Sequence, residues 1–387
     1  MMSTDSSIRP AQGTPKVAIV HDELTRRGGA EMVLEELVRM YPQADVYALY
    51  AGNVPKMTID EVPYNIHTSS LQKFPAFFRK HPGRLLPFLP QAAEQFDLSG
   101  YDLVISSASG FAKGIVTRSG VPHLCYCHTP NRYLWDSSHA VLKNNKGTSL
   151  FLRMIFHYLR MVDFTFAQRP DAYIANSLYT KARIKTYYRK KSSVIYPPVD
   201  THFFTPGHTH TPKQDYFLVV GRLTREKRFD QAIEVAEKLG LNLKIAGVGS
   251  DEARLRKLAG KHTEFLGKVD RETLRELYRS ARALIQPGVE DFGIASVEAL
   301  ACGTPVIAFN KGGITEIVKS GVHGILYPDQ LPEMLAEAIR QFLRIEMAFY
   351  SGNLQKRAMN FTTEAFRSAI SREVEYLLQL RNTNNNL

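Results

Sequence analysis

Short runs of β-branched residues alternate with longer segments of helical hydrophobic period along most of the chain, and this alternation constrains the fold more than any other feature. Parallel strands need long crossover connections, which helices usually supply, so the pattern predicts parallel sheets covered by helices. Because both halves of the chain show it, we expect an α/β fold with two doubly wound sheets. The predicted strands are residues 16–21, 45–50, 102–107, 123–128, 172–177 and 192–197 in the first half, and 216–221, 242–247, 263–267, 281–287 and 304–309 in the second.

The length of 387 residues also suits two domains of ordinary size. Residues 196–215 are rich in Pro, Thr and His and lack a hydrophobic period, which predicts a linker. We expect a flexible tail at 1–15, a first domain at 16–199 and a second domain at 200–361, with a C-terminal helix at about 362–382 that packs back on the first domain. A cleft between two such domains is the usual place for a ligand.

Charge and cysteine content limit the partners and the compartment. The net charge of +11 and the pI of about 9.4 favour an anionic partner. Nucleic acid is not predicted, because the chain has no helix-turn-helix and no RNA-binding aromatic signature. Three cysteines cannot form a disulfide framework in a chain of this size, the N-terminus is polar rather than secretory, and no uncharged apolar run reaches about 18 residues. We therefore expect a cytoplasmic protein without a membrane-spanning segment.

One segment combines positive charge with aromatic and aliphatic bulk: LQKFPAFFRKHPGRLLPFLP, residues 71–90. Its mixture of Phe, Leu, Lys and Arg suits a surface that lies in a lipid headgroup layer. The alternative is an irregular loop, broken by prolines, that packs on its own domain. The first interpretation predicts peripheral contact with the anionic inner face of the cell membrane.

The strongest local signal is GVEDFGIASVEALACGTPVIAFNKGG, residues 288–313. A strand ends before it, a loop carries Glu290 and Asp291, and a helix that contains Glu298 follows and closes at Gly303. In doubly wound sheets the space beyond the strand end binds ligands, helped by helix N-terminal amides. Two carboxylates beside an anion site suit the recognition of hydroxyl groups, although any single glutamate could simply be exposed on a helix.

Two other strand ends carry residues that suit a phosphate. In VVGRLTREKRFD, residues 219–230, a glycine and a basic loop place Arg222 and Lys227 where a diphosphate could lie. In HDELTRRGGAEMVLEEL, residues 21–37, Gly28 and Gly29 open an amphipathic helix and allow a ligand to approach the backbone. Neither stretch matches G-x-G-x-x-G or the P-loop, which disfavours a nicotinamide or P-loop nucleotide site.

The stretch HLCYCHTPNRY, residues 123–133, contains two histidines and two cysteines. On a buried strand Cys125 and Cys127 point to one face, where small core residues are more common than metal ligands. Finger-like C-x-x-C spacing is absent from the sequence, so no metal site is predicted. His128 falls at the end of this strand and is expected to face the cleft.

Together these motifs resemble the retaining, nucleotide-sugar-dependent glycosyltransferases of family 4 (glycosyl transferases group 1), which have the GT-B architecture of two Rossmann-like domains facing across a cleft. The resemblance extends from Lys16 onward, and its most specific motif is Glu290-x7-Glu298 with the following CGTPVIA. Through DLVISSASGFAKG and CYCHTPNRYLWD the chain is most similar to bacterial mannosyltransferases of O-antigen and exopolysaccharide assembly.

The resemblance implies a role for each candidate residue. Glu298 would hold the ribose hydroxyls, and Arg222 and Lys227 would neutralise the diphosphate. Glu290 would hold the hexose, His128 would lie beside it, and Gly29 would let donor and acceptor meet. The resemblance places further contacts in the same pocket: Gly28, Arg132, and the backbone amides of Phe292, Gly293 and Ile294.

The resemblance also implies the reaction and the partners. A hexose, best taken as mannose from GDP-mannose, would pass with retained configuration to a polyprenyl-diphosphate-linked glycan at the membrane. The protein would supply position and charge rather than a nucleophile, and no cofactor or metal is expected beyond the donor. The alternatives are a nucleotide-sugar 2-epimerase of the same architecture and a non-catalytic, membrane-associated scaffold.

Overall fold

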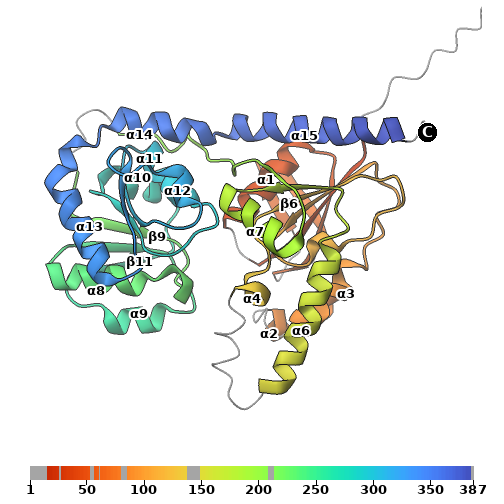
Figure 1. Cartoon of the computed structure of the whole chain (residues 1–387), viewed down its shortest axis with the longest axis horizontal. Coiled ribbons are helices and arrows are strands. Elements are labelled where there is room, and N and C mark those ends of the chain that lie inside the picture. Colours follow the sequence, from red (N-terminus) through yellow and green to blue (C-terminus); the bar gives the residue numbers. More distant parts are fainter. Residues whose placement is uncertain are drawn as a thin grey trace, which may run out of the picture.

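In the computed structural model, which describes residues 15–25, 28–52, 56–60, 62–79, 85–136, 149–207 and 213–384, the chain forms two α/β domains side by side (Figure 1). The N-terminal half builds one domain around an eight-stranded sheet, and the C-terminal half builds the other around a six-stranded sheet. The predicted α/β fold with two doubly wound sheets is thus confirmed. The expected tail at 1–15 lies outside the described residues except for its last position.

The first sheet has the strand order β3-β4-β2-β1-β5-β6-β7-β8. Every pair of neighbours is parallel except β3 and β4, which form an antiparallel edge. Its strands are β1 (Val17–Leu24), β2 (Asp45–Ala51), β3 (Lys56–Ile59), β4 (Val62–Thr68), β5 (Leu103–Ala108), β6 (His123–Cys127), β7 (Ala172–Ala175) and β8 (Ser193–Val194). The sequence pattern did not predict β3 and β4.

Alternate residues of these central strands are buried on opposite faces of the sheet, as the two-residue repeat of a strand requires. Ile19, Ile105 and Tyr126 face a core covered by α1 (Gly29–Met40) and α15 (Thr363–Asn384). Cys125 and Cys127 face the other core with α7 (Leu178–Tyr188), so these cysteines serve as small buried residues. Burial raises the pKa of the Cys125 thiol to about 12, which keeps it protonated.

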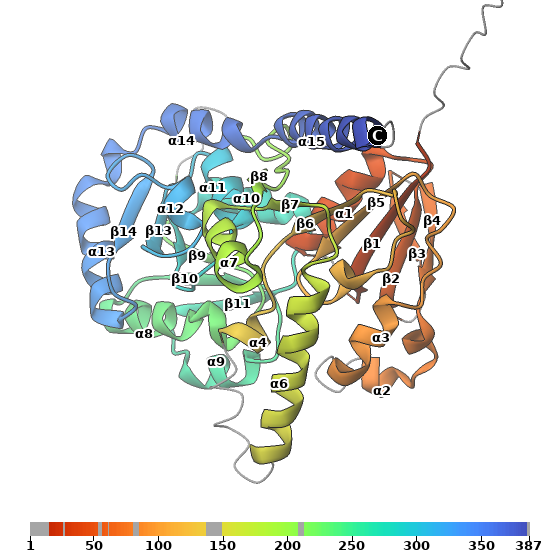
Figure 2. The same cartoon turned by 45° about the vertical axis from the view of Figure 1, so that its right-hand side comes forward.

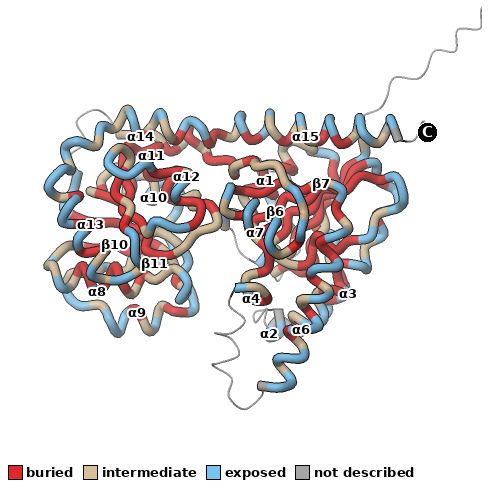
Figure 3. The backbone as a smooth tube through the Cα atoms, in the orientation of Figure 1, coloured by how far each residue is buried: buried red, intermediate tan, exposed pale blue. Residues whose placement is uncertain are grey.

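The second sheet is wholly parallel and has the order β11-β10-β9-β12-β13-β14. Its strands are β9 (Phe217–Val220), β10 (Leu243–Ala246), β11 (Thr263–Gly267), β12 (Leu284–Gln286), β13 (Val306–Phe309) and β14 (Gly324–Tyr327). One face packs on α8 (Phe229–Leu239), α9 (Glu252–Leu258) and α13 (Pro332–Ile345), and the other on α10 (Arg271–Ser280), α11 (Ile294–Ala301), α12 (Ile314–Ile317) and α14 (Ser351–Ala358). Figure 3 shows both sheets as buried layers.

The end of the chain returns to the first domain. Helices α14 and α15 run along one side of the molecule and span both domains (Figures 1 and 2). Phe366, Ile370 and Val374 of α15 are buried in the core under β1. Residues 196–207 of the expected linker are packed rather than loose, since Val199 donates its N–H to Phe361 O at 3.0 Å and Phe204 is buried. Residues 208–212 lie outside the described part of the chain.

The basic segment 71–90 folds as short helical turns in the described residues. These are η1 (Ser70–Lys73), α2 (Ala76–Arg79) and η3 (Leu86–Phe88), followed by α3 (Leu89–Ala93). They share a core with α6 (Ser149–Phe166), an 18-residue helix that projects from the first domain (Figure 2). In the described part of the chain, every helix is too short or too polar to cross a lipid bilayer.

Candidate functional site

Two helix N-termini from different domains meet where the sheets face each other. Helix α1 begins at Gly29 directly after β1, and α11 begins at Ile294 after β12. A Cβ at Gly29 would lie 2.8 Å from Ile294 Cδ1, so the two helix starts are in close contact and a larger residue at Gly29 would displace the Ile294 side chain. Unpaired amides and the helix dipole make each N-terminus attractive to an anion. Both features that favour an anion therefore lie at this interface between the domains.

His128, immediately after β6, belongs to a buried cluster on the N-domain side of this site. Its Nε2 lies 2.8 Å from Ser107 Oγ, and the same hydroxyl lies 3.1 Å from His21 Nδ1. His21 Nε2 in turn lies 3.9 Å from Glu31 Oε1. Burial, with a smaller effect of His21, lowers the pKa of His128 to about 3. His128 is therefore neutral at physiological pH and suits a hydrogen bond to a hydroxyl group.

Two acidic residues at this cluster, Glu31 and Asp22, make different contacts. Burial disfavours the ionised form of Glu31, but the hydrogen bond and charge of His21 outweigh it and lower the Glu31 pKa. Asp22 accepts the backbone N–H groups of Ser109, Gly110 and Ala112 at 2.6, 2.7 and 2.8 Å. It thereby shapes the loop after β5 that borders the site. Sequence reasoning missed His21, Asp22, Ser107 and Glu31, although the first three lie near the ends of β1 and β5 and Glu31 lies in the first turn of α1, which was a usable signal.

On the C-domain side, Glu290 and Lys227 are brought together. Lys227 Nζ forms an ion pair with Glu290 Oε1, and the two side chains are about one-fifth exposed. Lys227 closes the turn η5 (Arg225–Lys227) after β9, whereas Glu290 lies in the loop before α11. Arg222 is exposed on the loop between β9 and η5. A diphosphate at the two helix ends would meet these cations, and Glu290 would remain beside it to accept hydroxyl groups.

Glu298 lies one turn inside α11 and is only 7% exposed. Tyr278 donates its hydroxyl to Glu298 Oε2 at 2.9 Å. Burial raises the pKa of Glu298 to about 7, and the Tyr278 hydrogen bond partly opposes that rise. A carboxylate with one partner retains acceptor capacity for further hydroxyl groups.

Asp291, the neighbour of Glu290, joins the two domains. Its Oδ1 lies 2.9 Å from Arg132 Nη2 and 2.9 Å from Arg183 Nη1, and it accepts the Thr129 hydroxyl at 3.0 Å. Its carbonyl oxygen accepts the Ser177 hydroxyl at 2.6 Å. We call these five residues the Asp291 clamp. Arg132, predicted as a pocket residue, is thus a member of the clamp and contacts Asp291.

A second contact between the domains caps α7. Glu316 of α12 accepts the backbone N–H groups of Leu178 and Tyr179 at 2.7 and 3.0 Å. Tyr196 donates its hydroxyl to the same carboxylate at 3.2 Å. A carboxylate at a helix N-terminus is favourable because it satisfies free amides and meets the positive end of the dipole. The two contacts therefore link the domains through α7.

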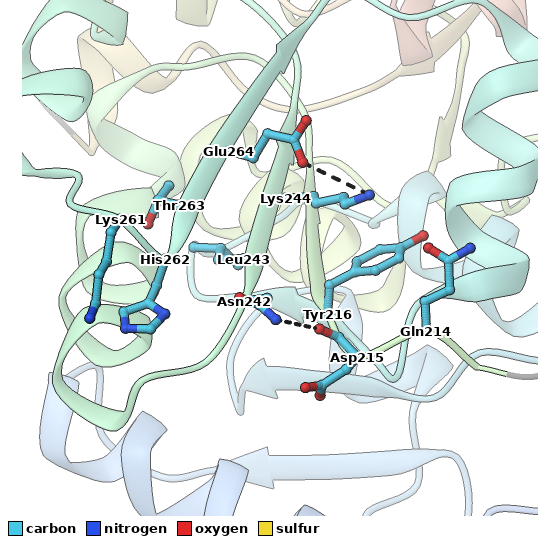
Figure 4. A pocket seen from close by; sticks show the side chains of 10 residues that line it. All are labelled: Gln214, Asp215, Tyr216, Asn242, Leu243, Lys244, Lys261, His262, Thr263 and Glu264. Carbon is cyan, nitrogen blue, oxygen red and sulfur yellow. Dashed lines mark hydrogen bonds and ion pairs between the residues drawn. The ribbon is translucent and has the colours of Figure 1, made fainter.

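Among the pockets that the described residues form, two lie at opposite ends of the strands of the second sheet. One, of about 460 Å³, lies beside the Lys227 turn and is lined by Tyr133 of the N-domain and by Thr224–Glu226 and the start of α9. The other, of about 320 Å³, lies at the opposite ends of β9, β10 and β11, where Lys244 pairs with Glu264 at 3.8 Å (Figure 4). None of the predicted site residues lines either pocket, although the first lies beside the Lys227 turn and includes Tyr133 of the N-domain.

The predicted residues thus come from both domains, and the structure brings together Gly29 with Ile294, Lys227 with Glu290, and Arg132 with Asp291. Gly28, Gly29 and His128 come from the N-domain, and the others from the C-domain, apart from Arg132 in the clamp. Phe292 is buried, and Gly293 has a φ of 112° as the residue before α11, a conformation that glycine adopts readily. Sequence reasoning missed Arg183 and noted Asp291 only as a loop residue.

Known families match both domains. The family described as Glycosyltransferase Family 4 matches residues 27–203, and the family described as Glycosyl transferases group 1 matches residues 201–364. An uncharacterized glycosyltransferase of Methanocaldococcus jannaschii is 28% identical over 258 residues, which cover 64% of this chain and 67% of that protein. A GDP-mannose-dependent alpha-(1-6)-phosphatidylinositol dimannoside mannosyltransferase of Mycobacterium tuberculosis is 37% identical over 141 residues, covering 34% of this chain and 36% of that one.

Across eight curated relatives, the chain spans between 35% and 67% of the relative's own length. The solved structure of Anabaena HepE in complex with UDP and glucose matches the whole fold, with a TM-score of 0.67 and 18% identity, over 94% of this chain and 100% of that one. The two domains therefore have the GT-B architecture, and the chain belongs to the glycosyltransferases of the family 4, group 1 type.

Proposed function

We propose that the protein transfers a hexose from a nucleotide sugar to a lipid-linked glycan, with retention of the anomeric configuration. The observation that carries the proposal is the meeting of the α1 and α11 N-termini between the His128 cluster and the Lys227–Glu290 pair. This arrangement offers an anion site with a neutral imidazole on one side and carboxylates on the other. A sugar diphosphate presents the matching groups, a charged phosphate pair and hydroxyl-rich rings.

In the proposed complex, the diphosphate lies at the α11 N-terminus with Lys227 and Arg222 beside it. As the bond between the sugar and the diphosphate breaks, negative charge grows on the leaving oxygen, and these cations and amides stabilise it. The sugar becomes oxocarbenium-like, and the acceptor hydroxyl attacks the face that the diphosphate leaves. The leaving phosphate takes the hydroxyl proton, so that no side chain has to act as a nucleophile.

We take the donor to be GDP-mannose, with Glu298 on the ribose hydroxyls, Glu290 on the hexose and His128 on a sugar hydroxyl. The mycobacterial relative, a GDP-mannose-dependent mannosyltransferase, supports a mannosyl donor, whereas the UDP and glucose bound by HepE support UDP-glucose. The acceptor in this proposal is a polyprenyl-diphosphate-linked glycan of O-antigen or exopolysaccharide assembly, presented at the inner face of the membrane.

A donor screen tests the proposal. Calorimetric titration of GDP-mannose, UDP-glucose and related donors into the full chain is expected to show binding, with GDP-mannose the tightest donor. Lys227→Met is expected to weaken that binding about tenfold or more, because a charge-assisted contact to phosphate is lost. Lys238→Met, on the exposed side of α8, is the matched control and is expected to bind like the wild type.

Binding of no nucleotide sugar would contradict the proposal and favour a non-catalytic scaffold. Product analysis with the tightest donor then separates transfer from isomerisation. Release of GDP with the hexose on an acceptor supports transfer, and a donor inverted at C2 with no acceptor product would assign an epimerase instead.

A further inference from the structure

Helix α6 carries a stripe of large apolar side chains that no described part of the chain covers. The stripe consists of five residues with high exposure: Leu150 (75%), Phe151 (68%), Met154 (64%), Tyr158 (55%) and Met161 (51%). Figure 3 shows the exposed end of this helix projecting from the first domain. Soluble monomers seldom expose a contiguous apolar surface of this kind unless it meets a partner.

The stripe is separate from the face by which α6 joins its domain. At 3.6 residues per turn, positions 151, 154, 158 and 161 align along one side of the helix. Phe156, Leu159 and Phe166 point to another side and are buried against the 71–93 segment. The helix is therefore apolar on two sides, and the fold of the described residues accounts for only one.

Charge identifies the kind of partner. Arg153, His157 and Arg160 flank the stripe, and the single acidic residue of α6, Asp163, is buried and paired with Lys113 at 2.6 Å. The sequence has no Asp or Glu in 137–162 or in 62–93, the two stretches that contain α6 and the segment packed on it. Their Lys and Arg residues are Lys73, Arg79, Lys80, Arg84, Lys143, Lys146, Arg153 and Arg160. An apolar stripe within an acid-free, basic region complements an anionic lipid surface.

The base of the helix is held firmly enough to carry such a contact. Asp163 also accepts the Trp135 indole N–H at 2.7 Å, and α4 (Arg132–Trp135) joins this anchor to the clamp through Arg132. Next to α6, Phe77, Phe78 and Phe88 of the basic segment are exposed as well. Insertion of α6 would thus orient the domain that faces the donor site.

We propose that α6 is an interfacial anchor that inserts Phe151, Met154 and Tyr158 into the headgroup region of an anionic membrane. The helix lies in the interface rather than crossing it, with the exposed Arg153 at the level of the phosphates. The inference rests on the proposed function only in that a lipid-linked acceptor requires the enzyme to reach a membrane. It differs from the expectation from sequence, which assigned the lipid contact to residues 71–90.

Vesicle co-sedimentation of the full chain tests the anchor. Vesicles with 30% phosphatidylglycerol in phosphatidylcholine, a composition chosen for the assay, are expected to bind the wild type, and pure phosphatidylcholine much less. Phe151→Ser/Met154→Ser is expected to lower the partition coefficient about tenfold or more, since two exposed apolar side chains no longer insert. The matched control is Met347→Ser/Tyr350→Ser, which removes one methionine and one aromatic ring that are 98% and 70% exposed on the second domain.

The outcomes are separable from those of the donor screen. Donor calorimetry without vesicles is expected to be unchanged in the α6 variant, and this also shows that the variant is folded. Equal binding of the α6 variant and the control, or no wild-type binding to anionic vesicles, would overturn the anchor. A concentration-dependent dimer that the α6 variant abolishes, without lipid binding, would assign the stripe to a second copy of the chain. Failure of donor binding with intact lipid binding would overturn the proposed function alone.

Discussion

At the scale of single residues, burial shifts the pKa of two side chains of the site, and each shift affects how that side chain could bind a sugar. His128 has a pKa lowered to about 3 by burial and by His21, so it meets a sugar as a neutral hydrogen-bonding ring. Glu298 has a pKa raised to about 7, mainly by burial. Ribose hydroxyls that donate to Glu298 would favour its ionised form, and donor binding would then offset part of the cost of burying a carboxylate.

The variant Glu298→Gln separates the free-energy cost of burying the Glu298 carboxylate from the role of Glu298 in donor binding. The folded pKa of about 7 exceeds the unfolded value of about 4.5, so ionised Glu298 destabilises the folded state increasingly from pH 4.5 to 7. Between pH 4.5 and pH 8, the free energy of unfolding of the wild type is expected to fall by about 3 kcal/mol more than that of Glu298→Gln, because the amide does not ionise. Urea denaturation at both pH values measures this difference.

The same variant is expected to lose most donor-dependent transfer while remaining folded. Glu333→Gln, exposed on α13, is the control for both measurements and should change neither. Full transfer activity in Glu298→Gln would contradict the assignment of Glu298 to the donor.

The positive charges of the site predict that transfer does not depend on a metal ion. Lys227, Arg222 and two helix N-termini together provide the positive charge that a divalent ion supplies elsewhere. Transfer is therefore expected to continue at an unchanged rate in excess EDTA. The measurement is the initial rate with and without chelator, and a loss that only Mg²⁺ or Zn²⁺ restores would contradict it.

At the scale of elements, the Asp291 clamp connects α4, α7 and the loop before α11. Arg183 is largely buried and also contacts Asp136, so its guanidinium is shared by a carboxylate from each domain. Breaking one partner of a partly buried network usually costs about 1–3 kcal/mol. Because Asp291 adjoins Glu290, a looser clamp would also displace the carboxylate that we assign to the hexose.

Asp291→Asn is expected to favour an open arrangement of the domains. The neutral amide no longer balances Arg132 and Arg183, so we expect a larger radius of gyration by X-ray scattering and a higher donor KM with a smaller change in kcat. Asp329→Asn, exposed after β14, is the control. Unchanged scattering and kinetics in Asp291→Asn would show that the clamp does not hold the domains together.

The same elements show what the sequence could and could not predict. The central strands were predicted because they are buried on both faces and form continuous apolar runs, and the two acidic motif positions followed from a strand end and a helix start. Edge strands β3 and β4 were missed, since β4 is mostly exposed and lacks such a run. The clamp was missed because its partners lie 108 to 162 positions apart, a pairing that only the closed domains bring about.

At the scale of the whole molecule, the Asp291 clamp joins the two domains, and α4 connects the clamp to the projecting helix α6. The C-domain offers Lys227, Glu290 and Glu298, and the N-domain offers His128 and the anchor that we assign to α6. The helix α15 returns to the first domain, so the two domains are joined by this helix, by the clamp and by the Glu316 contact with α7. The packed structure shows which apolar side of α6 is buried and which stays outside.

The central claim is that a nucleotide sugar binds between the α1 and α11 N-termini, and a crystal structure of the full chain with the tightest donor tests it most directly. We predict the diphosphate within hydrogen-bond distance of Lys227 Nζ and the first amides of α11, the ribose on Glu298 and the hexose between Glu290 and His128. A donor bound elsewhere, for example in the pocket at the opposite ends of β9 and β10, would contradict the account.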